Sequence, residues 1–166
     1  MRKSTAFDAL AEGSYQSLAP FGAILLRLVM GLLFFFAGWA KLTLQGWSAA
    51  GFLQNATGPF ASWFQGLAGN GVVDFLNVWG LTLIGVALIL GLLVRTASFF
   101  GIVLMILYYF ADFVGNTAHG FIDEHVVYAS ILFLFIVGGV GHVWGLDALL
   151  ERRIDPRTTW AKLFLG

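Results

Sequence analysis

The sequence predicts an all-α integral membrane protein, a single four-helix bundle with both termini on the cytoplasmic side. Its 166 residues are 59% hydrophobic and only 11% charged, and its mean hydropathy is +0.86, whereas soluble domains carry roughly 25% charged residues. The 17 phenylalanines and 6 tryptophans suit contact with lipid better than the small core of so short a soluble chain. Four long apolar stretches and the placement of the basic residues complete the prediction.

The four apolar stretches occupy residues 20–42, 72–94, 96–114 and 125–144. Each is long enough, or nearly so, for a helix that crosses about 30 Å of hydrocarbon. Only the short connection around Arg95 separates the second stretch from the third, so we expect these two to form an antiparallel hairpin. We expect residues 1–166 to form one domain.

Basic residues near membrane ends are retained in the cytoplasm, so their positions predict the orientation. They lie before the first stretch, between the second and third, and after the fourth, at Arg2, Lys3, Arg95, Arg152, Arg153, Arg157 and Lys162. The connections 43–71 and 115–124 contain no lysine or arginine. We therefore expect an even number of spans, cytoplasmic termini and two outward-facing connections.

The first outward connection, residues 43–71, is uncharged but rich in aromatic residues: Trp47, Phe52, Phe60, Trp63 and Phe64. The Gly58-Pro59 pair would interrupt a helix, so we predict two short helices that lie in the outer interface as an aromatic cap. We also expect interfacial helices in the two terminal arms, because apolar residues lie beside charged ones there. The apolar residues are Phe7, Leu10, Tyr15, Leu18, Trp160, Leu163 and Phe164.

Two cations lie within the first apolar stretch, Arg27 and Lys41. At about 100° per residue they share one stripe of the helix with Gly31, Phe34 and Gly38. Glycine lets another helix approach closely, so we expect this stripe to face the protein interior. At about 1.5 Å per residue the two cations lie roughly 21 Å apart, Arg27 in the inner half and Lys41 near the outer surface. Alternatively, Arg27 snorkels to the inner headgroups.

An unpaired charge inside the bundle is costly, so the cations predict nearby acids. Asp112, at the outer end of the third stretch, is the expected partner of Lys41. Asp74 begins the second stretch at the same level, with Asn77 on a similar face. The second outward connection adds further polar groups that we expect beneath the aromatic cap: His119, Asp123, Glu124 and His125. The alternative is that these residues pair only with one another and with loop backbone, and orient helices without chemistry.

Cofactor chemistry within the chain is restricted. The absence of cysteine excludes disulfides and cysteine-ligated iron-sulfur clusters. Haem is not expected, because His125 and His142 would stand about 25 Å apart on one helix. A divalent metal at His119, Asp123 and His125 is allowed by ligand type, but the spacing matches no known signature. Zero net charge and no long basic run give no reason to expect nucleic acid as a partner.

The spacing Arg27-x3-Gly31-x2-Phe34-x3-Gly38-x2-Lys41 resembles the first-helix pattern of the DoxX family. Residues 120–128 (GFIDEHVVY) and 141–147 (GHVWGLD) resemble the DoxD branch, the large subunit of thiosulfate:quinone oxidoreductase. The resemblance covers most of the chain. It implies a four-helix, multi-pass bundle of the prokaryotic inner membrane. We further expect other membrane-protein subunits as partners and quinone as a cofactor that is not covalently bound.

The first functional hypothesis is a quinone-linked oxidoreductase subunit, with thiosulfate or another sulfur anion as donor. Lys41 would attract the anion or bond to a quinone carbonyl, Asp112 would tune Lys41 and relay protons, and His125 would exchange protons. The remaining residues expected at the substrate site are Arg27, Trp39, Asp74, Tyr108, His119, Asp123 and Tyr128.

Two alternatives stay open. One is a non-catalytic subunit of a larger respiratory or photosynthetic complex, and it is supported by the lack of a residue here that can carry an electron. A small-anion transporter, with Arg27 and Lys41 along its path, is less favoured.

Overall fold

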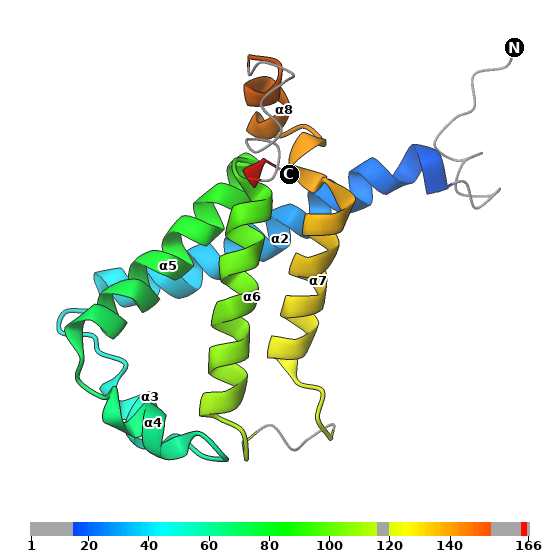
Figure 1. The fold of residues 1–166 in the computed structure, drawn as a ribbon. Helices are drawn as coiled ribbons and strands as arrows, with labels where there is room; N and C mark the ends of the chain where they lie inside the picture. The colour runs from blue at the N-terminus through cyan, green and yellow to red at the C-terminus, as the bar shows by residue number, and fades with distance from the viewer. Residues whose placement is uncertain (1–14, 116–119, 154–163, 166) are drawn as a thin grey trace, which may run out of the picture.

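The computed structural model describes residues 15–115, 120–153 and 164–165, and within these ranges it is helical, with no β-strand. Four helices form a bundle: α2 (Tyr15–Thr43), α5 (Gly71–Leu90), α6 (Val94–Ala111) and α7 (Glu124–Gly138). The short helices α3 (Ala50–Gln54) and α4 (Ala61–Gly66) lie between α2 and α5, and α8 (Leu146–Glu151) follows α7 (Figure 1). The predicted all-α fold is confirmed.

Three helices have the length and apolar composition needed to cross a membrane: Leu18–Thr43 within α2, α5 and α6. The fourth, α7, is apolar but has only 15 residues. It ends at Gly138 rather than at residue 144 as predicted, because Gly139 adopts a left-handed conformation with φ of 57° and redirects the chain. A 3₁₀ turn, η1 (Val140–His142), follows.

The bundle is built from two antiparallel pairs, α2 with α5 and α6 with α7, which are joined by the contact between α5 and α6 (Figure 1). Close approach of the first pair depends on small residues. A methyl group added at Gly38 of α2 would lie 2.6 Å from the backbone nitrogen of Thr82 in α5, so only glycine fits there. Side chains from all four helices fill the core. They include Phe34 of α2, Leu88 of α5, Met105 of α6, and Leu132 and Phe135 of α7.

The predicted stripe of α2 faces the interior. Arg27, Gly31, Phe34 and Gly38 are buried, and Lys41 is partly buried. Because the remaining faces of α2 carry exposed apolar side chains, the helix presents those faces to lipid and the stripe to protein. This prediction is therefore confirmed.

The bundle has two chemically different ends (Figure 1). One end, which we call the inner end, holds the short turn 91–93 between α5 and α6 together with η1 and α8. The opposite outer end holds α3 and α4, the end of α6 and the start of α7. The names follow the orientation predicted from the basic residues, which stays a prediction.

The aromatic cap contains two short helices on either side of the Gly58-Pro59 break, as the sequence predicted. Hydrogen bonds attach it to the bundle: Thr57 N–H donates to the Ala111 carbonyl at 2.9 Å, and Val114 N–H donates to the Thr57 hydroxyl at 3.0 Å. Leu53 and Phe64 of the cap pack with Ala111 in a second small core. The cap is thus a fixed part of the fold.

The interfacial helices predicted in the terminal arms fall mostly outside the described residues, including those around Phe7, Leu10, Trp160 and Leu163. The described part of the N-terminal arm begins at Tyr15 and is already part of α2.

Candidate functional site

Arg27 lies at the inner end, where its side chain is bound by backbone carbonyls. Only 2% of the residue is exposed, so it does not snorkel to the headgroups. Its Nη1 donates to the carbonyls of Val140 at 2.8 Å and Val143 at 2.9 Å, and its Nη2 donates to that of Trp144 at 3.4 Å. Arg27 thereby secures the irregular segment that follows α7.

Asp147 lies in the same region and is fully buried. Its carboxylate accepts hydrogen bonds from the N–H groups of Leu93 at 2.6 Å and Val94 at 3.0 Å, at the N-terminus of α6. A negative charge there is stabilised by the helix dipole, and Arg27 is near enough to interact with it electrostatically. We call Arg27, Asp147 and the backbone groups that they bind the inner charge cluster. Sequence reasoning gave Asp147 no role, although an acid so close to the glycine-rich end of the last span was a usable signal.

Lys41 lies at the outer end without the acid expected for it. Its Nζ donates to the Ala37 carbonyl of its own helix at 3.1 Å and lies 5.5 Å from the centroid of the Trp47 ring. Among the described residues, no carboxylate forms an ion pair with it.

The predicted pairing of Lys41 with Asp112 is wrong. Helix α6 ends at Ala111, so Asp112 occupies the C-cap position instead of continuing the interior stripe of the helix. Its side chain is exposed and lies against Gly115, within the following turn.

A cavity of about 430 Å³ opens beside Lys41. We call it the outer cavity. Every helix of the bundle and the cap contribute to its wall, which consists of Lys41, Trp47, Ser48, Phe52, Asn77, Tyr108 and His125. Most of the wall is aromatic, and an amine, hydroxyl groups, an amide and an imidazole converge on it. Such a mixture of apolar surface and a few polar groups is typical of small-molecule sites.

His125 in the first turn of α7 is oriented by Asp123. The imidazole Nδ1 lies 2.5 Å from the Asp123 carboxylate, and the ring packs edge-on against Tyr108 with centroids 5.8 Å apart. Because Asp123 engages Nδ1, the other ring nitrogen, Nε2, is the one available for exchange with a ligand.

Asp123 is also the N-cap of α7, since its carboxylate accepts from Val126 N–H at 3.0 Å. Burial by itself raises the pKa of Asp123, but the hydrogen bonds from His125 and Val126 outweigh it and hold the pKa below its ordinary value of 3.8. The carboxylate is therefore ionised at neutral pH and holds the His125 ring in position.

The other residues expected at the site lie elsewhere. Asp74 accepts a hydrogen bond from Ala49 N–H at 2.8 Å, and so ties the cap to α5. Trp39 is exposed and stacks on Phe35. Tyr128 is partly buried and packs against the main core, and Glu124 is exposed. His119 lies outside the described residues, so its predicted place stays untested.

The structure thus brings together Lys41, Tyr108 and His125, with Asp123 behind His125. Sequence reasoning missed the contributions of Trp47, Ser48 and Phe52 because the direction in which a cap side chain points depends on tertiary packing. It placed Asn77 at the right level without assigning it a role. An amide inside an otherwise apolar helix was the available signal.

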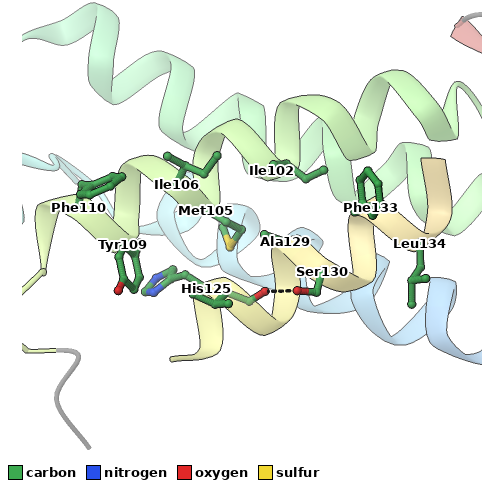
Figure 2. A pocket seen from close by; sticks show the side chains of 11 residues that line it. Ile102, Met105, Ile106, Tyr109, Phe110, His125, Ala129, Ser130, Phe133 and Leu134 are labelled. Carbon is green, nitrogen blue, oxygen red and sulfur yellow. Dashed lines mark hydrogen bonds between the residues drawn. The ribbon is translucent and has the colours of Figure 1, made fainter. Parts of the chain in front are cut away.

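Two apolar spaces adjoin the outer cavity. A groove of about 670 Å³ runs between α6 and α7, with His125 in its wall (Figure 2). Figure 2 shows His125 beside Tyr109, with Phe133 and Leu134 at the opposite end. The second space, of about 240 Å³, lies between α5 and α6 beneath the cap and shares Phe52, Asn77 and Tyr108 with the outer cavity.

These features define a class: a helical membrane protein with a partly polar cavity in one half of its bundle and apolar spaces beside that cavity. Residues 22–113 match the DoxX family model, which is more than half of the chain, and the protein belongs to the DoxX family. The matched segment includes Lys41, Asn77 and Tyr108 and ends before His125. Comparison with curated proteins gives no match, and neither does comparison with solved structures.

Proposed function

We propose that this DoxX family protein is the quinone-binding subunit of a membrane oxidoreductase and that it works in the prokaryotic inner membrane. The electrons would come from thiosulfate or another sulfur anion. The observation that supports this most is the convergence of Lys41, Tyr108 and His125 on one cavity that adjoins two apolar spaces. A quinone needs hydrogen-bond donors at its carbonyl oxygens and apolar surface around its ring, and the outer cavity offers both.

Each polar residue has a distinct part in this proposal. An ammonium group has three donors, and the Ala37 carbonyl engages one of those of Lys41, so Lys41 can donate to a quinone carbonyl. His125 delivers protons through Nε2, and Asp123 stabilises the imidazolium from the other side. Tyr108 supplies a hydroxyl group and ring surface.

The overall reaction balances with thiosulfate as donor. Two thiosulfate ions form one S–S bond as tetrathionate and release two electrons, and the quinone takes these electrons with two protons to become the quinol. His125 delivers the protons one after the other and regains them from the outer aqueous side. Because the chain contains no cysteine, a partner subunit supplies any thiol or cysteine-ligated cluster that the electron transfer requires.

Quinone binding to the purified protein in detergent tests the proposal. Lys41→Met and His125→Gln should each weaken binding about tenfold, because each removes one hydrogen bond to the quinone and a typical hydrogen bond contributes about 0.5–1.5 kcal/mol. Arg152→Met is the matched control, since it removes one exposed cation outside the cavity. If wild-type protein binds no quinone, or if both cavity variants bind as wild type does, the proposal fails.

A non-catalytic accessory subunit is the second candidate, and one sequence fact favours it: without cysteine, the chain has no thiol or cysteine-ligated cluster through which to pass electrons. Native purification separates the two functions. Protein that migrates alone with bound quinone contradicts the accessory role, whereas protein that is always recovered in a larger complex and binds no quinone supports it.

A further inference from the structure

The apolar space between α5 and α6, which we call the under-cap chamber, has a place in the proposed site. Its volume is about 240 Å³. The cap forms its roof through Leu53 and Phe64, and its side walls include Val73 and Leu104. Because hydrogen bonds hold the cap to the end of α6 and to the turn that follows it, this chamber is part of the folded protein before any ligand arrives.

The under-cap chamber adjoins the outer cavity across a shared wall. The two spaces share Phe52, Asn77 and Tyr108, and the rings of Phe52 and Tyr108 meet edge-on with centroids 6.0 Å apart. In contrast, the groove between α6 and α7 shares only His125 with the outer cavity. The larger common wall therefore lies on the cap side.

The under-cap chamber has exposed lining residues on α5 and α6, and we call this side its mouth. Leu76 of α5 is 62% exposed and Leu107 of α6 is 38% exposed, and both residues line the chamber. They lie within helices that are long and apolar enough to span the membrane. An apolar chain that starts in the outer cavity would have to pass the Phe52 and Tyr108 rings to enter the chamber, and it would then lie between α5 and α6 beneath the cap.

We infer that the under-cap chamber holds the apolar chain of the membrane quinone whose ring occupies the outer cavity, so that the cap favours quinones with a chain over chainless ones. This inference rests on the proposed function. A membrane quinone carries a polar ring and a long isoprenoid chain. With the ring beside Lys41, the chain must leave the cavity, and the chamber is the adjoining apolar space with the largest shared wall.

Blocking the mouth tests the inference. We would measure the affinity of dimethoxy-methyl-benzoquinone and of its decyl derivative for the detergent-solubilised full chain. Leu107→Trp and Leu76→Trp both add bulk at exposed positions of the mouth. Each variant should weaken binding of the decyl quinone about tenfold, which is equivalent to about 1.4 kcal/mol. The affinity for dimethoxy-methyl-benzoquinone, which has no chain, should change by less than about twofold. Leu134→Trp is the matched control, because Leu134 is about as exposed as Leu76 but lines the groove between α6 and α7.

The outcomes separate this inference from the proposed function. If the wild-type protein binds neither quinone, the proposed function fails. If it binds both and the two mouth variants leave the decyl quinone unaffected, only the under-cap path is wrong. If Leu134→Trp alone weakens the decyl quinone, the chain lies between α6 and α7, and the inference is overturned.

Discussion

The inner charge cluster and the outer cavity each contain one cation from the same stripe of α2, but the two cations have different surroundings. Arg27 is buried and donates three hydrogen bonds to carbonyls of a distant segment. Lys41 is partly buried and donates one hydrogen bond, to a carbonyl of its own helix. Around Arg27 the space is filled by backbone, whereas a cavity opens beside Lys41.

This difference teaches that the depth of a charge in a membrane helix does not determine its role. A cation that is engaged by backbone groups far along the chain joins parts of the fold, and removing it leaves buried acceptors without partners. A cation beside a cavity keeps donors for a ligand. The first should matter to folding and the second to binding.

The largest expected effect is that of Arg27→Ala. This variant leaves buried carbonyls and the buried Asp147 carboxylate without the guanidinium, so the free energy of unfolding should fall by about 3–5 kcal/mol. Unfolding of the detergent-solubilised protein with increasing SDS measures it. Wild-type stability in this variant would contradict the structural role and remove the contrast with Lys41.

The next effect is that of Asp147→Ala, which removes the acceptor from both backbone N–H groups at the start of α6. We expect a loss of about 2–3 kcal/mol, because hydrogen bonds to a charged group contribute more than neutral ones. Asp147→Asn keeps one acceptor oxygen and should lose about half as much. Faster hydrogen exchange of the Leu93 and Val94 amides would locate the effect, and equal losses in the two variants would argue against it.

A smaller effect, dependent on pH, is expected at the outer end from Asp123→Ala. Loss of this N-cap should cost about 1 kcal/mol at neutral pH. Because the folded state holds the pKa of Asp123 below 3.8, this stabilisation is present above that value and is lost as the pH falls below it. Unfolding curves of wild type and variant should therefore converge in strong acid. A stability difference that stays constant down to low pH would disprove the assignment.

The smallest effect on folding is expected from Lys41→Met. The variant removes a single hydrogen bond to a carbonyl of the same helix and keeps the apolar stem, so the free energy of unfolding should change by less than about 1 kcal/mol. The same SDS titration that is used for Arg27→Ala provides a direct comparison. A loss as large as that of Arg27→Ala would show that Lys41, too, is a folding residue.

The sequence predicted those features that depend on composition and local periodicity. Apolar stretches located the helices, the glycines on the α2 stripe identified its buried face, and the Gly58-Pro59 pair located the break in the cap. Burial of Arg27 followed from the same stripe.

Features that depend on where helices end, or on backbone acceptors, could not be predicted. Asp112 belongs to an interior stripe only if α6 continues past Ala111, and it does not. The acceptors of Arg27 are main-chain carbonyls of Val140, Val143 and Trp144, which no residue type reveals. The outer cavity also includes cap side chains whose directions arise only from packing.

The early end of α7 has a consequence for the surrounding lipids. Fifteen residues rise about 22 Å along a helix axis, whereas the hydrocarbon layer of a bilayer is about 30 Å thick. For α7 to cross such a layer, the bilayer beside it would have to become thinner, at a fraction of a kcal/mol per Å of hydrophobic mismatch. A bilayer that matched α7 would be thinner there than beside α2, α5 and α6, so its thickness would act most on the helix that carries His125.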